Sequence, residues 1–333
     1  MSVSSASLLD ANFDANFDAA FDAAFDTLAG DLAADCADHA PEDALRRLAA
    51  AGARDLGFAK LFEGHTDALA ILAEAGMAQL APAGSVWGTW CAEPPDARLR
   101  LESAGDGWIV DGRKAWCSGA RSVSHAVVSC WTPAGEAMLA AVDMRQRGIA
   151  FDDDGWRAVG MRTSNSIDVH FARVPARPVG GPGFYVGRAG FWHGGAGVAA
   201  CWHGAAARLA AVLQAQLAAR PGDPHRLAQL GQVAVALNGS AAMLREAAAA
   251  IDRAPARDAM ALALSVRLSV EAAATLTLAA VGRALGAGPL CKDAAIARLY
   301  ADLPVFMRQS HAERDQAALG TALVAGTEAP WLL

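Results

Sequence analysis

The chain has 333 residues, of which 54% are hydrophobic and 19% are charged, so it is long enough for two or three compact units. Its 28 lysines and arginines stand against 35 aspartates and glutamates, and the net charge of -7 argues against a general nucleic-acid binder. The six cysteines have no CxxC spacing, which argues against a zinc site or a disulfide framework and is typical of a reducing cytoplasm.

The first 85 residues predict an N-terminal helical domain. The sequence begins without a basic segment followed by an apolar core, so we expect no secretory signal. In the low-complexity leader 10–26, phenylalanine recurs every fourth residue, which predicts an amphipathic helix with a slowly winding apolar stripe. A partner-docking helix is the alternative for this leader. Apolar residues at helical spacing then continue from 41 to 80.

Residues 86–180 predict a β-domain of sandwich or barrel type. The segment 98–103 alternates apolar and polar residues, 104–107 is a turn, and 108–112 is a strand whose final Asp-Gly pair predicts a hairpin. Further strands are expected at 125–131, 137–144 and 166–174. No G-x-G-x-x-G motif follows a strand, so a nicotinamide-binding unit is not supported.

Residues 185–333 predict a C-terminal four-helix bundle. Long helical patterns cover about 190–219, 225–252, 256–286 and 293–320, with short connections between them. These alanine-rich stretches carry polar residues at helical intervals, and no run of about 18 apolar residues is free of polar groups, so no membrane partner is expected. The predicted fold class is therefore α+β multidomain, in the order helices, β-domain, bundle.

Three ordered motifs carry a resemblance to a known family. They are "CAEPPDA" at 91–97, "DGRKAWCSGA" at 111–120 and "WRAVGMRTSNSIDVHFARVPA" at 156–176. Over about 45–320 the chain resembles the acyl-CoA dehydrogenase superfamily of flavoproteins, which has the same order of domains. The resemblance implies a bound FAD, with FMN as a possibility, and the cofactor supplies the redox chemistry while the protein positions it.

The resemblance also implies which residues contact the flavin. The strand after the hairpin lies against the flavin ring in the family, where an aromatic face stacks and a small polar group reaches the polar edge. A second wall is supplied largely by backbone groups. The matching cofactor-binding residues here are Trp116, Cys117 and Ser118 on the first wall and Trp90, Cys91 and Ala92 on the second.

The glutamate that removes a proton from the acyl thioester in this family is missing from both of its usual positions. The start of the first bundle helix, at 191–206, has no carboxylate. In the late segment 300–315 the matching place falls at Ser310 and His311, and Glu313 is close enough in sequence to substitute. The predicted catalytic residues are therefore His311 and Glu313.

His311 also resembles a histidine of the dibenzothiophene monooxygenase-type branch. That branch has an R-D-like pair, matched by Ala301-Asp302, and a K-L-x-x-G-H stretch, matched by "KLFEGH" at 60–65. A neutral imidazole transfers a proton without the permanent charge of a carboxylate. The alternative for His311 is a structural role in capping or bridging bundle helices.

Arg220 follows the first bundle helix, where many family members place an arginine that reaches the FAD phosphates of a neighbouring subunit. An arginine at the end of a helix also simply favours the helix dipole. The resemblance implies a homodimer or homotetramer. No metal site is expected, because His193 and His203 lie nearly three turns apart on one helix.

These observations predict a cytoplasmic, flavin-dependent oxidoreductase that acts on a small molecule such as an acyl-CoA or a similar thioester. One alternative is a reduced-flavin-dependent monooxygenase that uses His311. The other is a catalytically silent relative that binds a flavin, an acyl group or a protein partner, in which bulky side chains such as Trp87, Trp90 or Trp192 fill the ring site.

Overall fold

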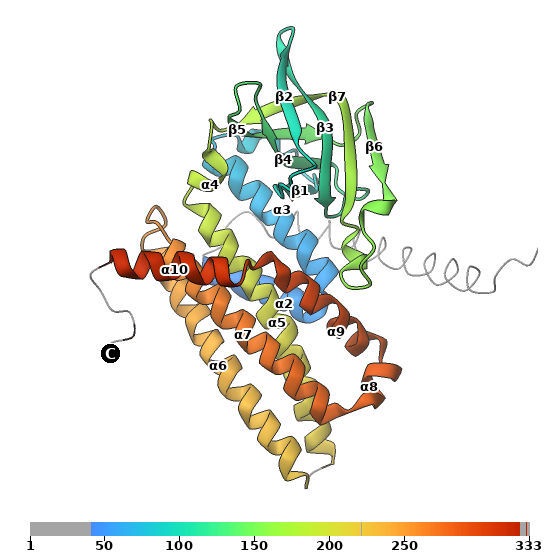
Figure 1. The fold of residues 1–333 in the computed structure, drawn as a ribbon, viewed down its shortest axis with the longest axis vertical. Coiled ribbons are helices and arrows are strands. Elements are labelled where there is room, and N and C mark those ends of the chain that lie inside the picture. The colour runs from blue at the N-terminus through green and yellow to red at the C-terminus, as the bar shows by residue number, and fades with distance from the viewer. Residues whose placement is uncertain (1–40, 221, 327–330, 332–333) are drawn as a thin grey trace, which may run out of the picture.

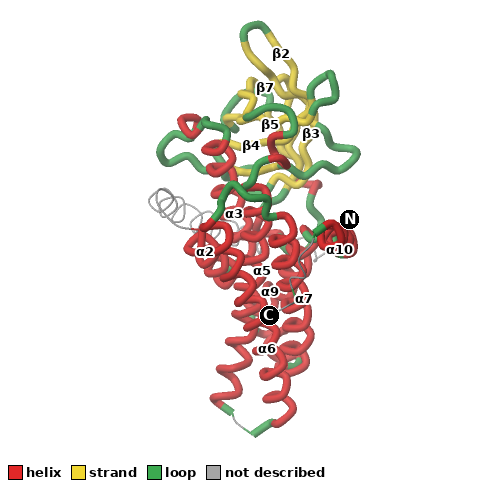
Figure 2. Tube along the Cα trace, turned by 90° about the vertical axis from the view of Figure 1, so that its left-hand side faces the viewer, coloured by secondary structure: helices red, strands yellow, loops and turns green. Residues whose placement is uncertain are grey.

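A computed structural model describes residues 41–220, 222–326 and 331 of the chain. The leader 10–26 lies outside these residues. A β-barrel-like sheet forms one end of the molecule and long helices form the other, with helix α3 reaching from the bundle to the sheet (Figure 1). The long helices run along the long axis away from the sheet (Figure 2).

Seven strands form the sheet, and five of them close into a ring. The strands are β1 (Trp87–Trp90), β2 (Leu99–Ala104), β3 (Gly107–Cys117), β4 (His125–Trp131), β5 (Ala137–Asp143), β6 (Ile149–Asp152) and β7 (Ile167–Val179). Neighbours pair in the order β4-β2-β3-β7-β5, and β5 pairs with β4 again, while β1 pairs with β4 and β6 with β7. Apolar side chains of alternating strand positions fill the ring, which is the core of this half.

The strands expected at 98–103, 125–131 and 137–144 are present to within one residue, but the hairpin expected at Asp111-Gly112 is wrong. The β2–β3 turn lies at Gly105-Asp106, and β3 runs on through Gly112 to Cys117. Gly112 instead marks a β-bulge: its φ is +125°, and a Cβ there would lie 2.7 Å from the Arg98 carbonyl oxygen. The Asp-Gly pair forms a bend inside a strand. The alternation of apolar and polar residues does not distinguish such a bend from a turn between two strands.

The helical half is built on three long helices that the sequence predicts well. The helices of the described chain are α2 (Pro41–Arg54), α3 (Leu56–Glu74), α4 (Phe184–Gly187), α5 (Gly190–Ala219), α6 (Pro224–Arg253), α7 (Met260–Leu285), α8 (Ala287–Lys292), α9 (Ala294–Phe306) and α10 (Glu313–Ala325). Short 3₁₀ helices are η1 (Ala78–Leu80), η2 (Asp153–Gly155), η3 (Arg162–Ser164) and η4 (Met307–Gln309). Aspartate side chains at 55, 223 and 293 accept backbone N–H groups at the starts of α3, α6 and α9.

The fourth long helix expected at 293–320 is broken, which corrects the simple four-helix bundle. Pro304 lies inside α9, and the chain then tightens into η4 and turns at Ser310–Ala312 before α10 begins. The turn is held locally, since Ser310 Oγ accepts the Ala312 N–H at 3.2 Å and Asp315 accepts the His311 N–H at 3.0 Å. Ala312 has a φ of +45°, so the backbone there is in a region that residues with a Cβ rarely adopt.

Helices α5, α6 and α7 are long and apolar enough to cross a membrane if length and composition alone are considered. In α5, 67% of the most apolar window is buried inside the protein, whereas in α6 only 22% is buried. The absence of a membrane partner therefore stays a prediction.

Helices α2 and α5 approach each other through glycines. A Cβ on Gly204 would lie 1.8 Å from the Ala49 carbonyl oxygen, and a Cβ on Gly52 would lie 2.0 Å from the Cys201 carbonyl oxygen.

We therefore expect Gly204→Ala to push α2 and α5 apart and to lower the free energy of unfolding by about 1–3 kcal/mol, measured by urea denaturation. Gly231→Ala is the matched control, because it lies on an exposed part of α6 with no neighbour in contact; it should raise stability by about 1 kcal/mol. Equal effects of the two substitutions would contradict the close approach of α2 and α5.

Candidate active site

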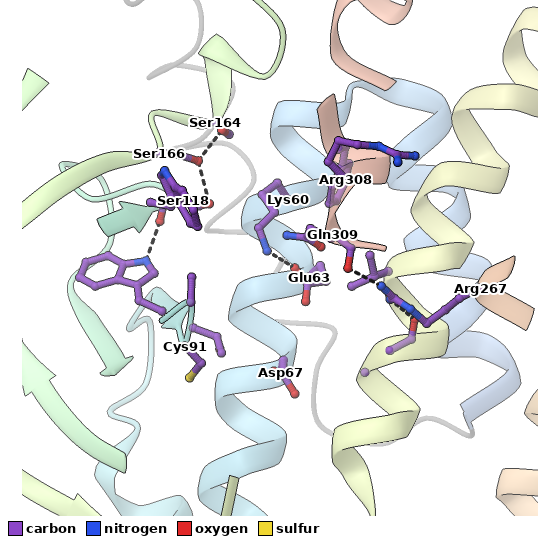
Figure 3. Close-up of a pocket in the computed structure, with 18 of the residues that line it drawn as sticks. Lys60, Glu63, Asp67, Cys91, Ser118, Ser164, Ser166, Arg267, Arg308 and Gln309 are labelled. Carbon is purple, nitrogen blue, oxygen red and sulfur yellow. Dashed lines mark hydrogen bonds and ion pairs between the residues drawn. The ribbon is translucent and has the colours of Figure 1, made fainter. Parts of the chain in front are cut away.

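A cavity of about 670 Å³ lies where the barrel meets the helices. Its walls come from five parts of the chain: β1 and β3 with the loops that follow them, the loop 156–166, α3, the short helix α4, and the bundle helices α5, α7, α9 and α10 with η4. In Figure 3 the serines of the barrel side face the charged side chains of α3 and the bundle across this space. The volume is in the range of small-molecule sites.

A second β-bulge turns Trp116 into the cavity. The pairing of β3 with β7 shifts between Lys114 and Cys117, and Trp116 has a φ of +58°, which is unusual for a bulky residue. Asp168 holds this bend, since its carboxylate accepts the Trp116 N–H at 3.2 Å and pairs with Arg113 at 2.5 Å. The indole of Trp116 is half exposed and lines the cavity. This bulge therefore presents an aromatic face to a ligand.

Three serine hydroxyls form a chain beside Trp116. Ser118 Oγ lies 2.8 Å from Ser166 Oγ, which lies 2.7 Å from Ser164 Oγ, and Ser164 donates to the Met161 carbonyl oxygen at 2.7 Å. All three serines line the cavity, and Figure 3 shows the chain running along its barrel side. The Trp90 indole N–H donates to the Ser118 carbonyl oxygen at 2.9 Å and so fixes the backbone there.

Of the six residues predicted to contact a flavin, five line the cavity and one does not. Trp90, Cys91, Ala92, Trp116 and Ser118 line the cavity. Cys117 does not: its side chain is fully buried in the barrel core, and burial raises the pKa of its thiol well above the usual value. The bulge directs the Trp116 side chain into the cavity and the Cys117 side chain into the barrel core, so the Cys117 side chain is not part of the cavity wall.

On the bundle side, the break between α9 and α10 places His311 on the cavity wall together with Asp315. His311 Nδ1 lies 3.6 Å from Asp315 Oδ1, one helical turn further on. Asp315 also accepts the His311 backbone N–H, so it orients this residue through two contacts. The His311 side chain is 57% exposed, and among the described residues its imidazole pairs with Asp315 rather than with a residue of another helix. That arrangement disfavours the helix-bridging alternative and suits a group that exchanges protons with a ligand.

Glu313, the second predicted catalytic residue, does not line the cavity. It is exposed in the first turn of α10, where a carboxylate favours the helix dipole. Its place beside His311 is taken by Asp315.

Arg267 of α7 is the buried cation of the bundle wall. Its guanidinium donates to the carbonyl oxygens of Gly195 at 3.0 Å and Gln309 at 2.7 Å, and it lies over the Trp202 ring, 5.0 Å from the centroid. Among the described residues it makes no ion pair, and burial lowers its pKa although the charges of Asp315, Glu63 and Glu271 act in the opposite direction. Arg267 thus joins α5 to η4 and keeps a positive charge at the cavity wall (Figure 3).

Helix α3 supplies a row of charged residues at one helical face (Figure 3). Lys60 Nζ pairs with Glu63 at 2.6 Å, and Asp67 pairs with Arg188 at 2.5 Å. Burial raises the pKa of Asp67 to about 6, although the charge of Arg188 opposes that shift. His65, from the same "KLFEGH" stretch, points elsewhere: its Nδ1 accepts the Trp87 N–H at 3.1 Å, and burial lowers its pKa to about 4. It is therefore a neutral anchor for β1.

Arg220 lies at the far end of α5 from the cavity. Helix α5 starts at the cavity and runs for 30 residues, so its end is roughly 45 Å away. The structure therefore does not bring Arg220 to the site of its own chain, and its predicted contact with the cofactor of a neighbouring subunit stays a prediction.

Asp302 of α9 fixes the loop that carries the serines. Its carboxylate accepts the Met161 N–H at 2.5 Å, and a Cβ on the neighbouring Gly160 would lie 2.1 Å from the Ala301 carbonyl oxygen. Burial raises the pKa of Asp302 to about 6, partly offset by the bond from Met161. Because the folded pKa is above the ordinary value, the protonated form stabilises the fold at low pH, and this contribution is lost as the pH rises from about 4 to about 6.

We expect Asp302→Asn to remove that pH dependence. The amide keeps an oxygen for the Met161 N–H but never ionises, so at pH 8 the variant should be more stable than wild type by roughly 3 kcal/mol, with a much smaller difference at pH 4. Urea denaturation at both pH values measures this. Asp154→Asn, at an exposed carboxylate, is the control and should change little at either pH. A stability gain that is the same at pH 4 and pH 8 would rule out the ionisation of Asp302 as its cause.

No family model matches this chain. The amino sugar nitrososynthase RubN8 of Streptomyces rubradiris is 39% identical over 82 residues, which span 23% of this chain and 19% of that protein. Solved structures match a much larger part of the chain. The methanesulfinate monooxygenase MsuC from Pseudomonas fluorescens has a TM-score of 0.75 at 20% identity, covering 88% of this chain and 85% of its own. The complex of TdsC from Paenibacillus sp. A11-2 with FMN and indole has a TM-score of 0.75 at 18% identity, covering 86% and 84%.

The chain has the acyl-CoA dehydrogenase-like fold. TdsC is a dibenzothiophene monooxygenase, so the expected similarity to that branch is confirmed at the level of the fold. Both neighbours extend across the barrel and the bundle, because each match covers more than four fifths of this chain.

Several residues of the site were not predicted from the sequence. Asp315 had a detectable signal, since it lies four residues after His311. Ser164 and Ser166 lie in a quoted motif, but their chain to Ser118 joins segments nearly fifty residues apart. Arg267 gave no signal, because an arginine in an apolar helix does not reveal which carbonyl groups it will meet.

Proposed function

We propose that this chain is a flavin-dependent monooxygenase that oxidises a small molecule in the cavity between barrel and bundle. The observation that carries the proposal is the His311–Asp315 pair on the cavity wall, at the segment where acyl-CoA dehydrogenases place a glutamate. A histidine that a neighbouring carboxylate orients is a common general acid and base in catalysis. The carboxylates on the cavity wall are otherwise engaged: Glu63 pairs with Lys60, and Asp67 with Arg188.

The residues of the barrel wall fit a flavin. Trp116 offers a stacking face, Ser118 offers a polar atom beside it, and the cavity is large enough for a ring system. When bound, reduced flavin supplies the electrons for activation of molecular oxygen. The residues of this chain would hold the ring, limit the access of water and move a proton at His311. FMN, which TdsC holds in its solved complex, is the first flavin to test.

The other predicted functions find less support. An acyl thioester as substrate relied on a glutamate base, and neither of its two positions carries one. A silent relative was expected to fill the ring site with tryptophan. Here Trp87 is buried away from the cavity, whereas Trp90 and Trp192 line it, and a space of about 670 Å³ stays open beside them. We further propose a cytoplasmic homo-oligomer, in which the largely exposed face of α6 meets a second copy.

Anaerobic binding and oxygen consumption test the proposal. Purified protein should bind reduced FMN, and on addition of air it should consume oxygen and transfer one oxygen atom to a substrate such as indole, the ligand seen in TdsC. A dehydrogenase would instead be reduced anaerobically by its substrate. Binding of neither oxidised nor reduced flavin would overturn the proposal.

A further inference from the structure

The three serines beside Trp116 form a hydrogen-bond chain with a fixed direction. The chain contains three contacts: Ser118 to Ser166, Ser166 to Ser164, and Ser164 to the carbonyl oxygen of Met161. Each serine hydroxyl has one proton to donate and two lone pairs that accept. The described residues therefore supply three protons for three contacts.

Only one assignment of protons satisfies every contact. A carbonyl oxygen cannot donate, so Ser164 must donate to Met161. Ser164 then has no proton left, so Ser166 must donate to Ser164, and Ser118 must donate to Ser166. Ser164 and Ser166 are almost completely buried, so leaving one of these contacts without a proton would be costly.

This assignment determines what Ser118, the first serine of the hydrogen-bond chain, offers to a ligand. Its only proton is directed into the wall, so its Oγ offers lone pairs alone to the cavity that it lines. We propose that Ser118 is a hydrogen-bond acceptor for the bound ligand, and that the site selects a ligand with an N–H or O–H group at this point. A ligand that has an unprotonated nitrogen or a carbonyl oxygen at this point would place its own lone pairs against those of Ser118 Oγ and would form no hydrogen bond there.

This property gives the proposed cofactor site a preference between redox states, and to that extent it rests on the proposed function. The central ring of an oxidised flavin has a bare nitrogen at its edge, whereas reduced flavin has an N–H at the same place. With that edge at Ser118, reduced flavin gains a hydrogen bond and oxidised flavin does not. The serine chain thus favours the form that reacts with oxygen and favours release of the spent form.

The backbone keeps the direction of the chain fixed. Met161 is held by Asp302, and the Gly119 N–H donates to the Ser164 carbonyl oxygen at 2.8 Å. The Trp90 indole holds the backbone of Ser118 at the other end. Both ends of the chain are therefore anchored to separate elements. Of the three serines on the cavity wall, Ser118 alone is not buried.

Binding of FMN in its two redox states tests the inference with wild type and Ser166→Ala. In wild type, reduced FMN should bind about tenfold more tightly than oxidised FMN, as expected for one hydrogen bond. In Ser166→Ala the Ser118 proton is released and turns to the cavity, so oxidised FMN should bind more tightly than in wild type and the preference should fall about tenfold. Anaerobic titration followed by tryptophan fluorescence gives both constants, and the midpoint potential of the bound FMN provides an independent readout.

Two further variants separate this effect from general damage. Ser118→Ala should weaken binding of reduced FMN, because it removes the acceptor. It should tighten binding of oxidised FMN less than Ser166→Ala does, because it removes the opposing lone pairs but offers no donor. Ser103→Ala, at an exposed position of β2, should leave both constants unchanged. If flavin binds but Ser166→Ala leaves the ratio of the two constants at its wild-type value, the inference is wrong and the proposed function stands. If flavin binds in neither state, the proposed function falls and this inference falls with it.

Discussion

Replacing His311 by alanine should lower the rate of substrate oxidation by a factor of about 10²–10⁴ while binding of reduced FMN stays as in wild type. The imidazole lies on the cavity wall and Asp315 orients it from one turn away, so its removal takes away a proton-transfer group and leaves the barrel wall intact. Single-turnover oxidation with pre-bound reduced flavin, followed by product analysis, separates the chemical step from binding.

Glu313→Gln is the matched control for His311, because it changes a carboxylate two residues away that does not reach the cavity. It should retain the wild-type rate. Asp315→Asn should give an intermediate loss, since the amide still accepts the backbone N–H of His311 but no longer stabilises a charged imidazole. A His311→Ala enzyme with the wild-type rate, or a Glu313→Gln enzyme that loses its rate, would move the proton transfer to another group.

The general architecture was predictable because it rests on periodicity. The apolar pattern and the flanking breaks placed both ends of α5 and α6 to within one residue and those of α7 to within four, and β4 coincides with the expected strand at 125–131. The order of helices, sheet and helices, together with three motifs, then indicated the fold that the solved structures share.

The errors have a common cause, which is a local bend inside a regular element. At Gly112 and Trp116 the strand β3 bulges, and at Ser310–Ala312 the last helix breaks. Each bend changes the direction in which the following side chains point. Helical spacing places Asp315 beside His311, but it could not show that a break in the helix would bring both to the cavity wall. Strand alternation could not show that Cys117 would enter the core.

The residues of the cavity wall are held in place by contacts between distant segments. Arg267 meets Gly195, which is 72 residues away, and Met161 meets Asp302, which is 141 residues away. No property of either partner alone indicates such a pair. The sequence thus located the strand and the helix that bear the site, whereas the partners that orient its residues came from packing.

The motif "CAEPPDA" has a structural meaning that leads to a second large effect. Glu93 holds the segment after β1 against the barrel: its carboxylate accepts from Ser129 Oγ and Trp131 Nε1, each at 2.5 Å, and from Lys114 Nζ at 3.2 Å. The Lys114 side chain is completely buried, with Ser129 as its other partner. Glu93 is therefore the counter-ion of a buried ammonium group, two residues from the cavity wall at Cys91.

We expect Glu93→Gln to lower the free energy of unfolding by about 3–5 kcal/mol, because it leaves the charge of Lys114 buried without a counter-ion. The double variant Glu93→Gln with Lys114→Met should recover much of this loss, since it removes both charges and keeps an apolar side chain of similar length in the barrel. Urea denaturation of the two single variants and the double variant gives the coupling energy. If the double variant loses as much as the sum of the two single variants, the pair is not coupled and Glu93 acts through Ser129 and Trp131 alone.

The same pair predicts how stability depends on pH. Burial by itself raises the pKa of Glu93, but the hydrogen bond from Ser129 and the charge of Lys114 outweigh it, so the pKa of this carboxyl is lowered. A carboxyl with a lowered folded pKa stabilises the protein above its unfolded value of about 4.3, and the contribution is lost as the pH falls below that value. Wild type should therefore lose stability relative to Glu93→Gln on acidification below about pH 4. Since Asp302 acts in the opposite direction between about pH 4 and pH 6, the two effects lie in separate pH ranges and can be measured in one series.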